Sequence, residues 1–220
     1  MPKWSKSIED YLKHIYLQSE QGTQKVGGQQ LAKRMSVSHA SVTAMLKRLS
    51  DFGLVVYEPY QGVALTPQGE QIALEVVRHH RLIESYLTEV LGMSWDEVHD
   101  EAEILEHHIS ERVEELMAAK LGNPRFDPHG HPIPALDGAL PRHESIRPLA
   151  QLAAGERATV RTVRNEHREM LQFLSGIGIV PDRLLTVQSH GPLGDTLTIV
   201  NESGVAHAIG REVAECIDVS

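Results

Sequence analysis

The sequence contains a single cysteine, Cys216, so no disulfide can form within the chain and nothing indicates an oxidising compartment. No apolar run approaches the roughly 18–20 residues that a membrane-spanning helix needs, and no charged-then-apolar leader opens the sequence. There is also no internal repeat and no low-complexity tract. These absences predict a cytoplasmic globular protein without a membrane partner, and 220 residues suggest two or three small domains.

The net charge of −9 at first argues against a nucleic-acid partner, but the charge is unevenly distributed. Residues 1–75 carry eight Lys/Arg and seven Asp/Glu, whereas residues 76–220 carry thirteen and twenty-three. Eight of the thirteen histidines fall between His79 and His143. The near-neutral first part is therefore compatible with DNA if its cations share one face, and the acidic, histidine-rich part is suited to cations.

The first 66 residues predict a winged helix-turn-helix. An amphipathic helix over residues 5–20 is followed by two short helical stretches, QQLAKRM and HASVTAMLKRLSDFG, and then by a hairpin in LVVYEPYQGVALT. The start of the third helix and its basic residues are the candidate DNA contacts: Ser38, His39, Ser41, Thr43, Lys47 and Arg48. The alternative is that Ser38 is only a helix cap and that the lysines are only a solvated surface.

The rest of the chain predicts three further regions, which make the protein mainly α with a small β part. Residues 67–123 form helices, the first starting at Thr66–Pro67, another at Ser94 and a third at Ser110. Residues 124–150 form a proline-rich linker. Short strand-like runs interrupted by one helical piece predict a small β-barrel over residues 151–220.

The stretch HDEAEILEHH carries the clearest chemical signal. On a continuous helix, one face about 100° wide would hold His99, Glu103, Glu106 and His107. One predicted helix earlier, His80 and Glu84 are again four residues apart. Such oxygen and nitrogen donors suit borderline or hard divalent ions. For either group of residues alone, the alternative is an acidic helix face exposed to solvent, but the two groups together favour a metal site. The HExxH motif of zinc peptidases is absent, so a zinc peptidase has no support.

Several segments together resemble the diphtheria toxin repressor family of metal-dependent regulators, in its long form with an SH3-like C-terminal domain. The resemblance covers nearly the whole chain, and it is most specific in VHDEA followed by EHH and in the FDPHGHPIP linker. It implies a homodimeric repressor that binds a palindromic operator in double-stranded DNA, and not an enzyme. Apolar residues expected at the dimer seam or in the chain's own core are Ile83, Tyr86, Leu87, Val90, Ile104 and Leu105.

The resemblance also implies two metal sites. The first matches Asp10, Glu103, Glu106 and His107. The second matches His80, Glu84 and His99, closed by two polar side chains of the C-terminal domain that fall on Glu166 and Glu169.

The first site favours Mn²⁺ as the cofactor, because iron-responsive members carry Met and Cys where Asp10 and Glu103 stand. Lys13 stands where manganese-responsive members usually place another acid, so this sequence lacks the extra acid of their closely spaced two-metal arrangement. Fe²⁺ remains the alternative effector. The competing functions are a winged-helix regulator that senses an organic ligand and a metal-dependent hydrolase.

Overall fold

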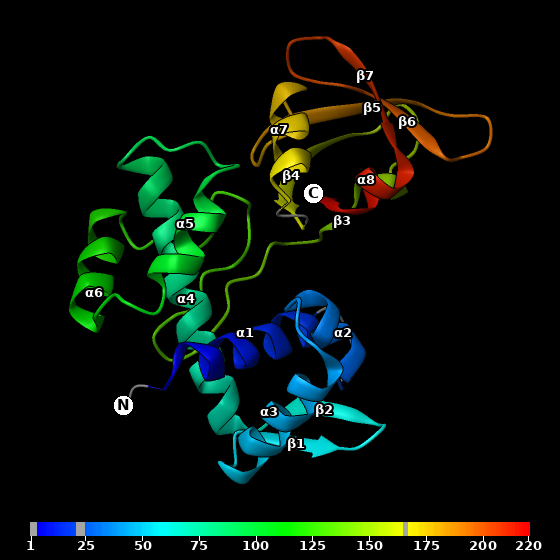
Figure 1. Cartoon of the computed structure of the whole chain (residues 1–220). Coiled ribbons are helices and arrows are strands. Elements are labelled where there is room, and N and C mark those ends of the chain that lie inside the picture. Colours follow the sequence, from blue (N-terminus) through cyan, green and yellow to red (C-terminus); the bar gives the residue numbers. More distant parts are fainter. Residues whose placement is uncertain (1–3, 21–24, 165–166) are drawn as a thin grey trace. The chain divides into compact units, whose positions relative to one another are not determined.

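The computed structural model describes residues 4–20, 25–164 and 167–220 (Figure 1). It divides the chain into two compact units, Met1–His79 with Pro134–Ala139, and His80–Ile133 with Leu140–Ser220. The long helix α4 (Pro67–Glu89) contributes residues to both units. Among the described residues, no helix is long and apolar enough to cross a membrane.

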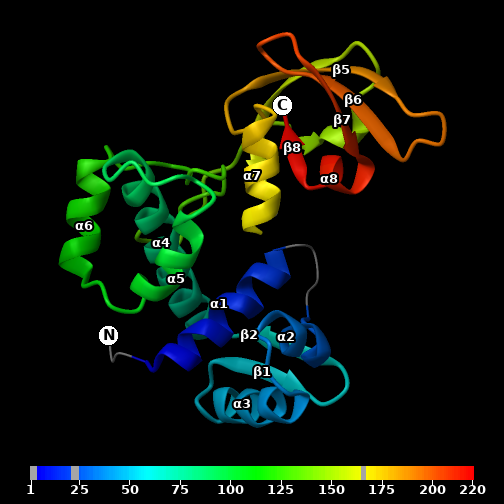
Figure 2. The same ribbon diagram turned by 45° about the horizontal axis from the view of Figure 1, so that its top comes forward.

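The first unit is a winged helix-turn-helix, as the sequence predicts (Figure 2). Its elements are α1 (Lys6–Glu20), α2 (Gly28–Arg34), α3 (His39–Asp51), the antiparallel strands β1 (Val55–Glu58) and β2 (Gly62–Leu65), and the start of α4. Its core is built from fully buried aliphatic side chains, among them Leu12, Ile15, Leu31, Val42 and Leu49. These side chains recur at helical spacing, and their burial holds the three helices together.

Local capping explains where two of these helices begin. The Ser38 hydroxyl accepts a hydrogen bond from the backbone N–H of Ser41, which satisfies one donor in the first turn of α3. The Thr66 hydroxyl likewise accepts from the N–H of Gly69, and Pro67 occupies the first position of α4. The predicted start of α4 is therefore confirmed.

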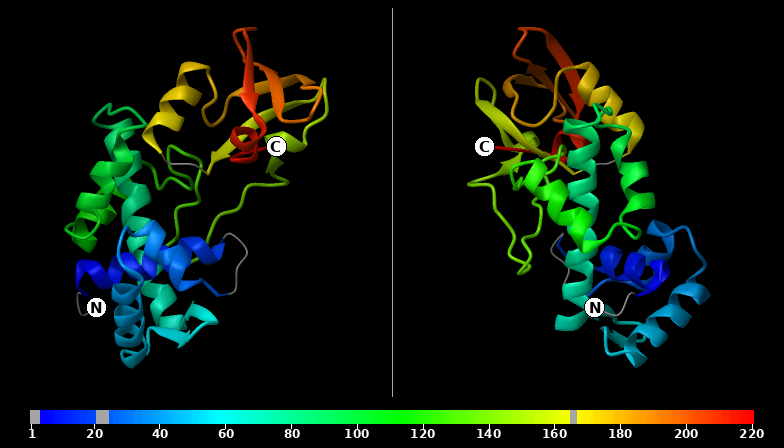
Figure 3. Two further views of the ribbon diagram at one scale, coloured as in Figure 1. Left: turned by 45° about the vertical axis from the view of Figure 1, so that its right-hand side comes forward. Right: turned by 90° about the vertical axis from the view of Figure 1, so that its left-hand side faces the viewer.

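The first part of the second unit is helical: it contains the end of α4 with α5 (Val98–Leu105) and α6 (Glu111–Lys120), which lie beside it (Figure 3). Ser110 caps α6 as predicted. The predicted start of α5 at Ser94 is wrong, because the Ser94 hydroxyl bonds the Asp96 carboxylate instead of a backbone N–H. The helix consequently begins at Val98, one turn later.

The C-terminal part of this unit is a six-stranded antiparallel sheet in the order β3-β8-β4-β5-β6-β7. Its strands are β3 (Arg147–Pro148), β4 (Arg157–Val163), β5 (Leu184–His190), β6 (Thr196–Val200), β7 (Ala206–Gly210) and β8 (Ile217–Val219). A 3₁₀ turn, η1 (Leu149–Gln151), precedes β4, and two helices, α7 (Arg168–Gly176) and α8 (Arg211–Glu215), interrupt the strands. No ladder joins β3 to β7 within the described chain, so the sheet is open where the sequence predicts a closed barrel.

The indole of Trp95 connects the α4–α5 loop to the C-terminal core. It is 9% exposed and packs in one cluster with Leu149, Leu171 and Leu174. Two polar contacts flank it, from Gln172 to Asp96 and from Arg168 to Glu97. The C-terminal sheet therefore docks on the helices of its own unit through an apolar anchor.

Candidate metal centre

Packing of α4 against α5 brings the predicted ligands together. Ile83 and Leu87 on α4 are buried against Val98 and Ala102 on α5. The residues with ligand atoms lie on the same parts of the chain: His80 and Glu84 on α4, His99 and Glu103 on α5, and Glu106 and His107 in the turn that follows α5. The helix ends at Leu105 rather than continuing through His107, but Glu106 keeps helical dihedral angles.

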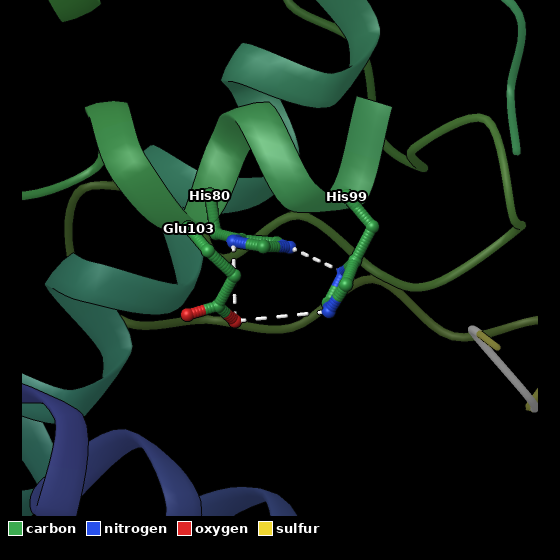
Figure 4. A group of neighbouring side chains, drawn as sticks. All are labelled: His80, His99 and Glu103. Atoms are coloured by element: carbon green, nitrogen blue, oxygen red, sulfur yellow. Dashed lines mark hydrogen bonds and ion pairs between the residues drawn. The ribbon is translucent and has the colours of Figure 1, made fainter. Parts of the chain in front are cut away.

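His80 is the centre of this cluster. Its Nδ1 lies 2.5 Å from Oε2 of Glu106 and 4.0 Å from Oε1 of Glu103. Its Nε2 lies 3.0 Å from Oε1 of Glu84 and 3.1 Å from Nδ1 of His99. Figure 4 shows the imidazole of His80 turned toward both His99 and Glu103. The two ligand sets that the family resemblance implies thus meet at one histidine.

Glu84, which contacts Nε2 of His80, is completely buried. Burial alone would favour its neutral form, but the charge of His80 and contacts with the imidazoles of His129 and His99 outweigh burial and hold the pKa of Glu84 well below its usual value. A buried carboxylate that stays ionised requires a compensating positive charge. Either imidazolium groups or a cation can provide it.

Glu106 and His107 extend the cluster beyond His80. Glu106 is 1% exposed and His107 5% exposed, and Oε1 of Glu106 lies 3.2 Å from Nε2 of His107. Glu103 is partly exposed, with Oε1 3.8 Å from Nε2 of His99. Buried carboxylates and imidazoles at these distances fit a divalent ion that prefers oxygen and nitrogen donors.

Three predicted ligands come from other elements of the chain. Asp10 is on α1, in the first unit. Glu169 is exposed in the first turn of α7 and belongs to none of the potential ligand groups found among the described residues. Glu166 lies outside the described residues.

The loop after α6 contains a further group of possible ligands that the sequence did not predict: Asp127, His129 and His131. Burial lowers the pKa of His129, but Glu84 and Asp127 outweigh burial and raise it to about 9. Oε2 of Glu84 and Nδ1 of His129 lie 3.5 Å apart. The alternating Asp-x-His-x-His pattern within FDPHGHPIP was the available signal.

The candidate DNA-contacting residues lie along α3, from its N-cap Ser38 to Arg48 in its last turn. Ser38, His39, Ser41, Lys47 and Arg48 are exposed, whereas Thr43 is half-buried. Ser38 caps the helix, and the Thr43 hydroxyl donates to the carbonyl of His39. Exposed polar and basic side chains on one short helix suit a recognition helix.

The predicted seam residues divide into two sets. Ile83 and Leu87 are buried in the unit's own core, so the intrachain alternative holds for them. Val90 and Ile104 are 38% and 56% exposed, and the neighbouring Leu91 is 62% exposed. Tyr86 and Leu105 are partly buried, so Val90 and Ile104 are the most exposed of the predicted seam residues.

Three family models match successive parts of the chain. Residues 3–63 match the N-terminal DNA binding domain of iron dependent repressors, and residues 66–135 match their metal binding and dimerisation domain. Residues 147–220 match the FeoA domain.

Similar proteins cover nearly the whole chain. The iron-dependent repressor IdeR of Mycobacterium tuberculosis is 32% identical over 97% of this chain and 96% of its own length. The diphtheria toxin repressor of Corynebacterium efficiens is 32% identical over 90% and 84%. A solved manganese-dependent transcriptional repressor in complex with manganese is 37% identical, with a TM-score of 0.88 over 96% of this chain and 98% of that one.

Proposed function

The chain belongs to the iron-dependent (diphtheria toxin) repressor family, whose members are metal-responsive DNA-binding repressors of metal homeostasis and not enzymes, and on that premise we propose that Mn²⁺ is its effector. The observation that carries the proposal is the buried, thiolate-free cluster around His80. Its carboxylates and imidazoles suit Mn²⁺ or Fe²⁺. Both iron-dependent and manganese-dependent repressors are among the relatives, so ligand type is the argument for manganese.

We propose that Asp10, Glu103, Glu106 and His107 form the effector site. Asp10 belongs to the unit that carries the recognition helix, and the other three belong to the second unit. An ion held by all four supplies the positive charge that their carboxylates need and links α1 to α5. Asp10 and Glu106 then fix the recognition helix relative to the second unit, which shifts the population toward the DNA-binding form.

His80, Glu84 and His99 form the proposed second site, with Glu166 and Glu169 as its further ligands. Two imidazoles and one carboxylate leave room for more donors around a divalent ion. The docking of α7 beside Asp96 and Glu97 supports a contribution from the C-terminal domain of the same chain.

The proposed DNA-binding form is a cytoplasmic homodimer on a palindromic operator. The exposed apolar side chains of Val90 and Leu91, just after α4, and of Ile104 on α5 support a dimer seam on these helices, because a second chain could cover them. Two recognition helices related by a dimer axis reach successive major grooves. A metal titration of affinity for an operator selected from random DNA tests this function.

Changing Glu103 to Cys is expected to shift the metal ranking in that titration. A thiolate at this half-buried position favours softer ions, so Zn²⁺ and Fe²⁺ should gain on Mn²⁺ by at least tenfold in the concentration needed for half-maximal DNA binding. Glu101→Cys, exposed on the same helix, is the matched control. An unchanged ranking in Glu103→Cys would remove ligand type as the basis of selectivity.

Changing Lys47 or Arg48 to Ala is expected to weaken binding to all DNA sequences by a similar factor and to reduce the salt slope by about one per phosphate contact in each half-site. Ser41→Ala should instead alter sequence preference, because Ser41 is exposed in the first turn of α3. The check is binding to operator and non-operator DNA at several salt concentrations. If both charge variants keep the salt dependence of the wild-type protein, Lys47 and Arg48 do not contact the DNA backbone.

A further inference from the structure

The end of α3 brings one cation and two aromatic rings into contact. The guanidinium carbon of Arg48 lies over the ring of Phe52, 5.5 Å from its centroid. The ring of Phe52 also contacts the indole of Trp4, with centroids 5.5 Å apart and 47° between the ring planes. All three residues belong to the first unit, and Phe52 is 43% exposed. Phe52 therefore joins a basic side chain of the recognition helix to an aromatic residue at the start of the chain.

The backbone at the end of α3 fixes the position of Phe52. Phe52 is the C-cap residue, and its N–H donates to the carbonyl of Arg48 at 3.1 Å. Gly53 follows with φ +70°, and the N–H groups of Gly53 and Leu54 donate to carbonyls of the last turn. These two bonds form a Schellman motif, which closes a helix firmly. Because Arg48 and Phe52 are four residues apart, their side chains are neighbours on the helix surface.

Trp4 supports the ring of Phe52 from a second element. It is half-buried and stands directly before α1. The carbonyl of Ser5 accepts hydrogen bonds from the N–H groups of Ile8 and Glu9, at 2.8 and 3.1 Å, which fixes the chain just after Trp4. Ile8 is buried in the core of the unit. The indole is thus held by the first turn of α1, and the two rings connect the start of α1 to the end of α3.

The guanidinium of Arg48 keeps its hydrogen-bond donors available. Arg48 is exposed, and it forms no hydrogen bond or ion pair with any described residue, although Asp51 is only three positions further along α3. A guanidinium over an aromatic ring retains N–H groups that can donate two parallel bonds to a phosphate. The first residues of a recognition helix contact base edges, and its last turn lies near the DNA backbone. Arg48 is in that last turn.

We propose that Phe52, supported by Trp4, positions the guanidinium of Arg48 for a phosphate of the DNA backbone. The inference rests on the DNA-binding function and gives it two uncharged positioning residues. An arginine side chain loses conformational freedom when it is immobilised at an interface. A ring that restricts the guanidinium before DNA arrives reduces this loss, so Phe52 strengthens DNA binding through Arg48 without reading the base sequence.

The test is a double-mutant cycle of Arg48→Ala and Phe52→Leu in the full-length protein, measured as affinity for operator and non-operator DNA at saturating Mn²⁺. Phe52→Leu should weaken binding to both DNAs by about two- to fivefold per recognition helix, the size expected of an exposed cation–π contact. In the Arg48→Ala background the same change should have no further effect, because Phe52 acts only through Arg48. Phe52→Tyr keeps the ring and should bind as wild type does. Phe173→Leu, at an aromatic residue of similar exposure in the second unit, is the matched control with unchanged affinity.

Additive losses from Arg48→Ala and Phe52→Leu would overturn the inference, because Phe52 would then act on DNA or on the fold by itself. Equal affinities of Phe52→Leu and wild type would overturn it as well. If Phe52→Leu does not fold in a thermal melt, the same cycle with Trp4→Leu decides, and its loss should likewise vanish without Arg48.

The metal response separates this inference from the proposed function. Metal-dependent DNA binding by the wild-type protein together with an additive cycle removes the positioning role and leaves the function intact. Wild-type affinity for DNA that does not respond to metal contradicts the proposed function itself.

Discussion

Glu106→Gln is expected to weaken metal-dependent operator binding tenfold or more, about 1.4 kcal/mol of coupling free energy. Glu106 is 1% exposed, and its two oxygens contact Nδ1 of His80 and Nε2 of His107. The amide keeps the volume of the side chain but removes the charge that a divalent ion would bind. The measurement is DNA affinity by fluorescence anisotropy at saturating and zero Mn²⁺.

Glu101→Gln is the control for this change, because Glu101 is exposed in the first turn of α5, the helix that ends just before Glu106. It should leave both affinities unchanged. Thermal melts without metal establish that Glu106→Gln folds. If a folded Glu106→Gln protein responds to Mn²⁺ as the control does, Glu106 is not a ligand of the effector site.

Trp95→Ala is expected to lower the free energy of unfolding of the second unit by about 3–5 kcal/mol. The indole is 9% exposed, belongs to the core of the C-terminal sheet and stacks on His129 with ring centroids 5.4 Å apart. Its removal leaves a cavity between the α4–α5 loop and the sheet. Denaturant unfolding followed by circular dichroism measures the loss.

Phe173→Ala, an aromatic residue of α7 that is 44% exposed, is the matched control and should cost less than about 1 kcal/mol. Trp95→Phe should recover most of the stability, because a smaller ring still fills the site. A loss in Trp95→Ala no greater than that of the control would mean that the loop is not an anchor for the C-terminal sheet.

Local signals predicted the elements whose ends are determined locally. Thr66 and Pro67 mark the start of α4, and Ser110 that of α6, because each cap uses neighbours in sequence. Ser94 gives the same local signal, but no helix begins there. Its hydroxyl bonds Asp96, and Trp95 is drawn into the core of a distant sheet. Tertiary packing overrode the cap there.

The candidate site shows the same division. The spacing of His80 and Glu84, and of His99 and Glu103, puts each pair on one face of its helix, but the meeting of the two pairs at His80 depends on how α4 packs against α5. The ligand group missed altogether was Asp127, His129 and His131, of which His129 is the most deeply buried. It lies in an irregular loop without a period, and its environment comes from Glu84, Trp95 and β4, all distant in sequence.

Affinity of the wild-type protein for its selected operator, measured against free Mn²⁺ with Mg²⁺ in parallel, tests the central claim most directly. The account predicts that Mn²⁺ raises the affinity at least tenfold, as two states coupled by about 1.4 kcal/mol or more require. Mg²⁺ at the same concentration should have little effect, because it binds imidazole poorly. Operator affinity that is independent of every divalent ion tested would contradict the account.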